Sequence, residues 1–165
     1  MNIKSEYEIK NSRGSVHLLL VGQSKGHISK LIEIFEPVHI DMFTSSDLFI
    51  DVSKFIKSID TYKGTYHVSV IPAFTENSIF SGISIIYSRY KSLKLRFPVN
   101  RIYFGITGGT NTMAVEMALT AVMTEEHMHY VVKDQSNENA VENIILFNTE
   151  ELNEIIKNGT ISEVR

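Results

Sequence analysis

The strongest constraint on the fold is the alternation of two hydrophobic patterns along the chain. Six apolar runs have the length of β-strands, and several are continuous, as in strands covered on both faces. These runs lie at residues 15–22, 38–43, 65–71, 101–106, 128–132 and 142–147. Between most of them, apolar residues recur with the period of an amphipathic helix. The alternation predicts an α/β fold: a Rossmann-like three-layer sandwich with a mostly parallel central sheet of six strands.

Each predicted helix is identified by an apolar stripe and by its end signals. The stripes are Ile28, Leu31, Ile32 and Phe35; Leu48, Val52, Phe55, Ile56 and Ile59; Ile79, Ile83, Ile86, Tyr90 and Leu93; Met113, Met117, Ala118 and Ala121; and Leu152, Ile155 and Ile156. Pro37 ends the first helix, and Ser45 and Ser46 are the expected caps of the second. Thr149 is the expected cap of the last helix, and Gly159 its stop.

The two ends of the chain depart from simple alternation. The link at 133–141 is short and polar, so it is too short for a crossover helix and predicts an antiparallel last strand. Alternating apolar residues within 1–14 predict an N-terminal extension or edge strand. We expect one domain over 1–165, with a short C-terminal helix in 149–165.

Composition narrows the classes of function. The chain has 165 residues, a formal net charge of -3 and no cysteine. The charge argues against broad binding to duplex DNA or to an anionic membrane, and the lack of thiols excludes thiolate chemistry. No apolar run reaches the length of a membrane span, and the N-terminus lacks the hydrophobic stretch of a signal peptide. We expect a cytoplasmic protein that needs no cofactor and no metal.

Small polar residues follow the first four predicted strands. In an open parallel sheet, ligands bind beyond the carboxyl ends of the strands, where the strand order reverses. The stretch 101–119 also places a glycine–threonine turn at a helix N-terminus, where backbone amides suit an anion. The candidate ligand-binding residues are Gly22, Gln23, Thr44, Ser45, Ala73, Phe74, Thr75, Thr107, Gly108, Gly109, Thr110 and Met113.

These residues also have structural interpretations. Gly108 and Gly109 are equally explained as a tight turn before a helix, with Thr110 as its N-cap. Lys25 either offsets phosphate charge or is a solvated loop lysine. The dinucleotide fingerprint G-x-G-x-x-G and the P-loop pattern are not matched, which disfavours an ordinary NAD enzyme or NTPase.

Three histidines are interpreted as structural. His27 begins a predicted helix, where such a residue is more often structural than a general base. His127 and His129 have no nearby carboxylate or cysteine to complete a metal site, so we assign them to the surface or the core.

Two stretches resemble a known family. "VHLLLVGQSKGHISKLIEIF" (16–35) and "ITGGTNTMAVEMALTAV" (106–122) are similar to the opening strand and the fourth-strand turn of the CRISPR-associated Rossmann fold (CARF) domains. The turn of that family typically reads T-G-G-T-[KN]-x-M-[AS], and the order of strands matches over residues 15–147. The resemblance implies a homodimer whose two crevices together bind a cyclic oligoadenylate, the messenger of type III CRISPR defence.

The resemblance also implies a reaction. Most family members carry a second domain that responds to the ligand, and about 18 residues after 147 leave no room for one, so we expect a standalone member. Standalone members include ring nucleases, which open the messenger without a metal. A ribose 2′-hydroxyl attacks the adjacent phosphorus and leaves a 2′,3′-cyclic phosphate end, so the protein aligns the groups and stabilises charge.

Catalytic roles follow from the same resemblance. Ser24 matches the polar residue that positions the ribose, and Asn111 stands where many members carry lysine or arginine. Lys25 would supply the positive charge from the opposite wall, and cyclic tetra-adenylate is favoured over hexa-adenylate. A non-catalytic sensor or sink that acts through a separate protein is the second hypothesis. An unrelated α/β nucleotide-binding domain is the third.

Overall fold

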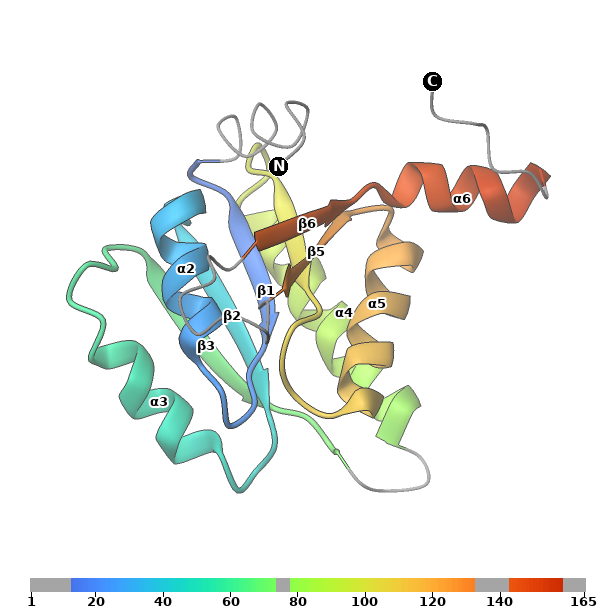
Figure 1. Ribbon diagram of the computed structural model, residues 1–165. Helices are drawn as coiled ribbons and strands as arrows, with labels where there is room; N and C mark the ends of the chain where they lie inside the picture. The colour runs from blue at the N-terminus through green and yellow to red at the C-terminus, as the bar shows by residue number, and fades with distance from the viewer. Residues whose placement is uncertain (1–12, 74–77, 133–142, 159–165) are drawn as a thin grey trace.

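A computed structural model describes residues 13–73, 78–132 and 143–158 and contains one six-stranded sheet (Figure 1). The strands are β1 (Val16–Leu20), β2 (His39–Thr44), β3 (Thr65–Val70), β4 (Ile102–Gly105), β5 (His127–Val132) and β6 (Asn143–Phe147). Their spatial order is β3-β2-β1-β4-β5-β6. All neighbouring pairs from β3 to β5 are parallel, and β6 pairs antiparallel to β5. The predicted Rossmann-like sheet with an antiparallel last strand is confirmed.

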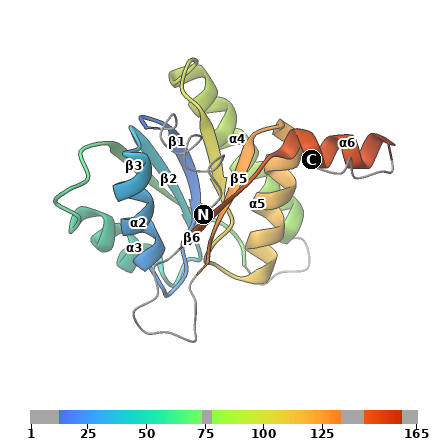
Figure 2. The same cartoon turned by 45° about the horizontal axis from the view of Figure 1, so that its top comes forward.

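Helices cover both faces of the sheet. They are α2 (Gly26–Phe35), α3 (Phe49–Lys57), α4 (Ser78–Arg96), α5 (Asn111–Thr124) and α6 (Thr149–Asn158). The first two pack on one face, and α4 and α5 pack side by side on the other (Figure 1). In contrast, α6 extends away from the body of the domain in two views (Figures 1 and 2).

The sheet separates two hydrophobic cores, and β1 together with the next residue, Val21, supplies both. Leu18 and Leu20 pack into the core under α4 and α5, whereas Leu19 and Val21 pack into the core under α2 and α3. All four side chains are at most 1% exposed. Because successive strand residues point to opposite faces, a strand that serves two cores must be apolar throughout. This explains why the first apolar run is continuous.

One ion pair ties α4 to the sheet. Arg89 on α4 donates from Nε and Nη2 to the two carboxylate oxygens of Asp41 on β2, at 2.8 and 2.9 Å. His39 Nε2 lies 3.4 Å from the same carboxylate. Burial alone would raise the pKa of Asp41, but the nearby His39 and the bidentate Arg89 outweigh it, and the pKa is lowered. Asp41 is therefore a buried anion held by a bidentate partner.

The structure corrects two predicted helix caps. The N-cap of α3 is Leu48, which makes no side-chain capping bond. Ser45 is buried in the turn before the helix, where its carbonyl oxygen accepts a hydrogen bond from Leu48 N. Ser46 also precedes this cap. Thr149 is the first residue of α6 rather than its cap, and its buried hydroxyl has no hydrogen-bond partner among the described residues. The predicted Thr110 cap of α5 is confirmed.

The predicted stripe on α4 is also partly wrong. Ile86 and Leu93 are buried as expected, but Ile79 is 38% exposed and Gly82 faces the interior instead. Compared with the predicted orientation, α4 is rotated about its axis so that Gly82 lies against α5. The predicted N-terminal edge strand and the Gly159 stop lie outside the described residues.

Candidate functional site

The glycine turn between β4 and α5 is fixed at both ends. Gly108 and Gly109 have φ values of +95° and +67°, which residues with a side chain rarely adopt. On one side, Thr107 Oγ1 accepts a 2.6 Å hydrogen bond from Val131 N of β5. On the other side, Thr110 Oγ1 accepts from Met113 N at 3.3 Å and caps α5. The protein's own hydrogen bonds therefore define the shape of the turn.

This turn touches the loop that follows β1. A Cβ placed on Gly22 would lie 2.9 Å from Gly109 N, and one on Gly108 would lie 3.0 Å from the carbonyl oxygen of Leu20. Only glycines allow the two backbones to approach this closely. Since β1 and β4 are neighbours and their connections run in opposite directions across the sheet, the contact marks the topological switch point. The two loops that the sequence places around a ligand crevice therefore lie in contact at the carboxyl ends of β1 and β4.

The helix that leaves this turn gives the crevice its electrostatic character. The amides in the first turn of an α-helix lack partners within the helix, and the helix dipole places partial positive charge there. At this end of α5, Gly109 and Asn111 are exposed and Thr110 is half-buried. The arrangement suits a phosphate or another anion.

The loop that follows β1 carries three further predicted site residues, Gln23, Ser24 and Lys25. Gln23 and Ser24 are exposed, so their side chains are accessible to solvent just beyond the carboxyl end of β1. Lys25 is half-buried, and its Nζ donates to the carbonyl oxygen of Gln23 at 3.2 Å. The ammonium group of Lys25 is thus held by its own loop, and it would have to leave Gln23 to place its charge beside the glycine turn.

Four other predicted ligand-binding residues are buried. Thr44 is fully buried, and its hydroxyl donates to the carbonyl oxygen of Val21 at 2.8 Å. Ser45, Ala73 and Met113 are also buried, with exposed fractions of 8%, 8% and 1%. Their side chains pack within the protein instead of opening into the crevice. Phe74 and Thr75 lie outside the described residues.

His27 supports the glycine turn. It lies buried in the first turn of α2, and its Nε2 is 3.2 Å from the carbonyl oxygen of Leu20. A Cβ on Gly108 would be 3.3 Å from its ring, so the imidazole backs the glycine turn. This position agrees with the structural interpretation of His27.

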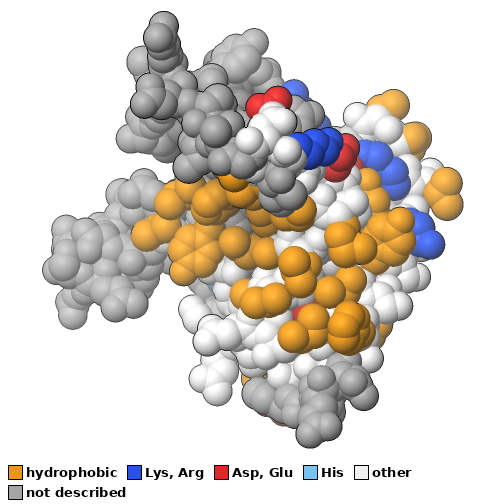
Figure 3. Space-filling view, turned by 90° about the vertical axis from the view of Figure 1, so that its right-hand side faces the viewer, with side chains coloured by type: hydrophobic (Ala, Val, Ile, Leu, Met, Phe, Trp, Pro, Cys, Tyr) orange, Lys and Arg blue, Asp and Glu red, His pale blue; other side chains and the backbone are white. Residues whose placement is uncertain are grey.

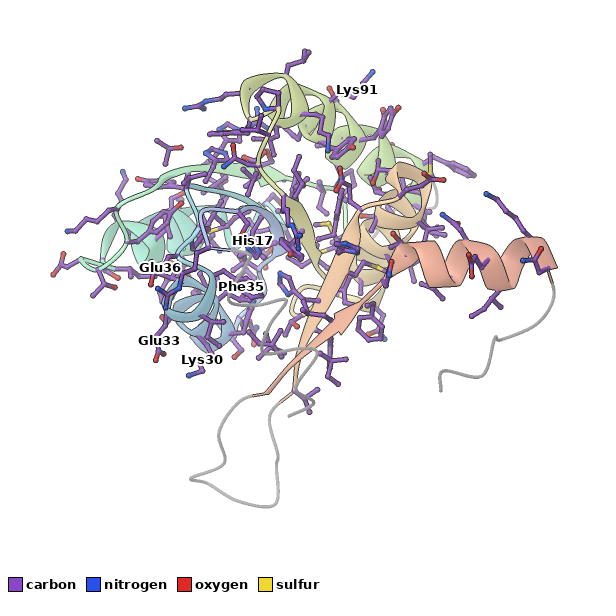
Figure 4. The ribbon with its side chains drawn as sticks, turned by 90° about the horizontal axis from the view of Figure 1, so that it is seen from above. His17, Lys30, Glu33, Phe35, Glu36 and Lys91 are labelled. Carbon is purple, nitrogen blue, oxygen red and sulfur yellow. The ribbon has the colours of Figure 1, made fainter. Side chains whose placement is uncertain are left out.

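A buried histidine pair lies deeper in the sheet. His17 Nδ1 is 3.0 Å from His129 Nε2, and Ser15 Oγ is 2.8 Å from His17 Nε2. His17 also packs against Phe35, with ring centroids 4.8 Å apart (Figure 4). Burial lowers the pKa of both histidines, that of His129 to about 3, so both rings are neutral. His129 is confirmed as a core residue, and its partner was missed because the two lie 112 positions apart.

Sequence reasoning also missed a buried carboxyl group behind the site. Glu116 on α5 is fully buried, and its two oxygens have no hydrogen-bond partner among the described residues. Any Cβ at Gly82 on α4 would collide with this carboxyl group. Burial raises the pKa of Glu116 to about 7. A single glutamate within an otherwise apolar and small-residue helical face was the available signal.

The raised pKa predicts a pH dependence of stability. An acid whose pKa is higher in the folded than in the unfolded state stabilises the fold below the unfolded value of 4.5, and this contribution is lost as the pH rises to about 7. Between pH 5 and 8, the free energy of unfolding of the wild type should therefore fall by an amount on the order of 1–2 kcal/mol. We expect Glu116→Gln to abolish this fall, as measured by urea unfolding. The matched control is Glu125→Gln, an exposed residue at the end of the same helix, which should keep the wild-type slope. Identical slopes for wild type and Glu116→Gln would contradict the assignment.

The described residues contain neither a metal-binding cluster nor a membrane-spanning helix. No set of three or more histidine, aspartate or glutamate residues is placed to hold a metal ion within the described ranges. Within the same ranges, no helix has the length and apolar character required to cross a membrane.

Comparison with solved structures identifies the fold. No protein-family model and no curated protein matches the sequence. Csm6 from Enterococcus italicus, solved with cyclic hexa-2′-fluoro-hexa-dAMP, has a TM-score of 0.62 at 15% identity, covering 78% of this chain and 36% of its own. Can2 from Sulfobacillus thermosulfidooxidans, solved with cyclic tetra-adenylate, has a TM-score of 0.58 at 13% identity, covering 72% and 32%. The fold is CARF-like.

A third structure has the same fold. Protein VC1899 from Vibrio cholerae gives a TM-score of 0.61 at 11% identity, covering 78% of this chain and 35% of its own. The chain thus spans about a third of the length of each of these proteins. The predicted CARF resemblance is confirmed at the level of the fold.

Proposed function

We propose that the chain binds a cyclic oligoadenylate in the crevice between the Gly22 loop and the Gly108–Gly109 turn. The observation that carries the proposal is the close contact of these loops at the N-terminus of α5, where backbone amides can receive a phosphate. The ligands of Csm6 and Can2 in their solved complexes support the same class of ligand. Titration calorimetry with cyclic tetra-adenylate and cyclic hexa-adenylate tests it. No heat and no competition with either ring would overturn the proposal.

The bound state is a homodimer in this proposal. A cyclic oligoadenylate is two-fold symmetric, so two copies of one crevice can hold the two halves of the ring. The chain has a suitable surface, which we call the apolar face. It consists of the exposed side chains Ile79, Phe80, Tyr87, Val115, Leu119 and Met123 on α4 and α5. Figure 3 shows hydrophobic side chains gathered in a broad band on this side of the molecule.

The exposure of this face supports a protein partner. Phe80 is 80% exposed and Met123 is 62% exposed, although both are large and apolar. Contiguous apolar surface of this kind marks an interaction site more often than a solvated surface. We favour cyclic tetra-adenylate over the hexa-adenylate as the ligand of the dimer.

Cleavage is the second part of the proposal. We propose a metal-independent ring nuclease, in which a substrate 2′-hydroxyl attacks the adjacent phosphorus and the 5′-oxygen leaves with a proton. The protein supplies alignment and charge stabilisation: the exposed Ser24 orients the ribose, and the amides of the glycine turn hold the phosphate. Lys25 provides positive charge after leaving Gln23, and Asn111 donates a hydrogen bond without charge. These roles suit a slow enzyme.

Ser24→Ala tests the division between binding and cleavage. We expect a fall in single-turnover rate of about tenfold, the effect of one lost positioning hydrogen bond, with ligand affinity changed less than threefold. Product analysis in excess EDTA should show linear products ending in a 2′,3′-cyclic phosphate. Ser29→Ala, an exposed serine of α2, is the matched control. A wild-type rate in Ser24→Ala would remove that residue from the mechanism.

The second candidate function is a non-catalytic sensor or sink. It is favoured by Asn111, which brings no cationic side chain to the phosphate side of the crevice. Tight binding of an intact ring after prolonged incubation would establish this alternative. Binding would then stand without cleavage.

A further inference from the structure

The helix α6 (Thr149–Asn158) forms an arm beyond the domain. Its base is fixed, because Thr149 is fully buried and Leu152 packs against the core under α4 and α5. Beyond that turn the helix extends away from the body in three views (Figures 1, 2 and 4). Glu154, Lys157 and Asn158 are exposed, while Ile155 is half-buried. An isolated helix of ten residues is marginal in water, so this arm needs a surface to cover its apolar side.

Among the described residues, the part of the sheet beside this arm also exposes large apolar side chains. Tyr130, Ile145 and Phe147 are 41%, 44% and 37% exposed. Tyr130 pairs with Ile145, and Phe147 pairs with Met128, whose side chain belongs to the core under α4 and α5. These residues therefore lie on the same side of the sheet as the apolar face and continue it across β5 and β6. The arm leaves the domain directly after Phe147, next to this uncovered surface.

We infer that the α6 arm is exchanged between two copies of the chain, with Ile155 of each arm packing against Leu119 and Met123 of the other copy. The inference rests on the proposed homodimer and specifies how it is held. An arm that projects from one copy and an apolar face that is open on the same side form an isologous pair, since a two-fold axis satisfies both arms at once. Burial of two arms would stabilise both helices and remove the exposed apolar residues from water.

The position of the arm separates assembly from ligand binding. Because β6 is antiparallel, it ends at the edge of the sheet opposite to the carboxyl ends of β1 and β4. The arm begins there, and the crevice lies at the other edge. Residues of the arm can therefore be changed without changing any residue of the ligand-binding loops.

Site-directed disulfide cross-linking tests the exchange. Because the chain has no cysteine, only the introduced thiols can form a disulfide. Ile155→Cys protein and Met123→Cys protein are mixed and oxidised, and the products are separated on non-reducing gels. We expect a mixed disulfide dimer as the main product. The control replaces Met123→Cys by Asp51→Cys, which lies exposed on α3 in the opposite layer and should give little mixed dimer.

Other outcomes overturn the exchange. A disulfide formed within one chain of the double variant Met123→Cys, Ile155→Cys would show that the arm folds back on its own domain. A disulfide between two Ile155→Cys chains without the mixed product would place arm against arm. A third outcome is that none of these cross-links forms, although sedimentation shows a dimer and titration shows ligand binding. That outcome would reject the arm exchange and leave the proposed function intact.

A second variant measures the contribution of the arm. Ile155→Glu is expected to raise the dimer dissociation constant at least tenfold in sedimentation equilibrium, with an unchanged circular dichroism spectrum. Glu154→Gln, one position away and exposed, should leave the constant within twofold. An unchanged dissociation constant in Ile155→Glu would contradict the inference.

Discussion

Replacing Arg89 with alanine is expected to lower the free energy of unfolding by about 3 kcal/mol, because the buried Asp41 carboxylate would lose its bidentate partner. The Asp41 side chain is 1% exposed beneath Arg89, so loss of the guanidinium would leave its carboxylate only partly solvated. His39 is the remaining neighbour, and its Nε2 lies 3.4 Å away. Urea unfolding at pH 7 measures the effect.

The matched control is Lys91→Ala on the same helix. Lys91 projects from the outer side of α4 (Figure 4), and its Nζ lies 5.0 Å from the centroid of the Tyr87 ring. Its removal should cost less than about 1 kcal/mol, as for most exposed residues. An Arg89→Ala variant as stable as Lys91→Ala would show that the Asp41 ion pair contributes little to the fold.

Changing Gly109 to valine is expected to weaken cyclic oligoadenylate binding at least tenfold. The positive φ at this position strains a β-branched residue by about 1–3 kcal/mol. The new side chain would also press on Met113, whose Cε lies 3.3 Å from the Cβ position, and would stand where the proposed ligand would approach. Titration calorimetry against wild type gives the change in affinity.

Gly14→Val provides a control with the same backbone strain. Gly14 has a φ of +76°, and a Cβ there would lie 3.8 Å from Val38 Cγ1, in ordinary contact. It precedes β1, at the edge of the sheet opposite to the crevice. We expect both variants to lose stability but only Gly109→Val to lose affinity. Equal affinity in the two variants would remove the glycine turn from the binding site.

The features that the sequence predicted well are those set by local patterns. Continuous apolar runs predicted the buried parallel strands, and the short polar link before β6 predicted its antiparallel pairing. The turn at Gly108 and Gly109 followed from glycine chemistry before a helix, and its position followed from the rule for parallel sheets. Each of these needs only neighbours along the chain.

The features that were missed depend on pairs of residues far apart in the chain. Asp41 and Arg89 are 48 positions apart, and nothing near either residue indicates the other. Glu116 is buried because Gly82 leaves room for it across the α4–α5 contact. The rotation of α4 that creates this contact also exposes Ile79, which a helical period alone assigned to the core. Tertiary packing decided these positions.

The contact between Gly22 and the glycine turn has a consequence for the speed and strength of recognition. The two walls of the crevice already touch, and Thr107, Thr110 and His27 hold one of them in shape. A ligand that enters has little backbone to order, so most of its contact energy would appear as affinity. A turn that the fold already holds in this way favours rapid binding of the proposed ligand over a slow closing motion.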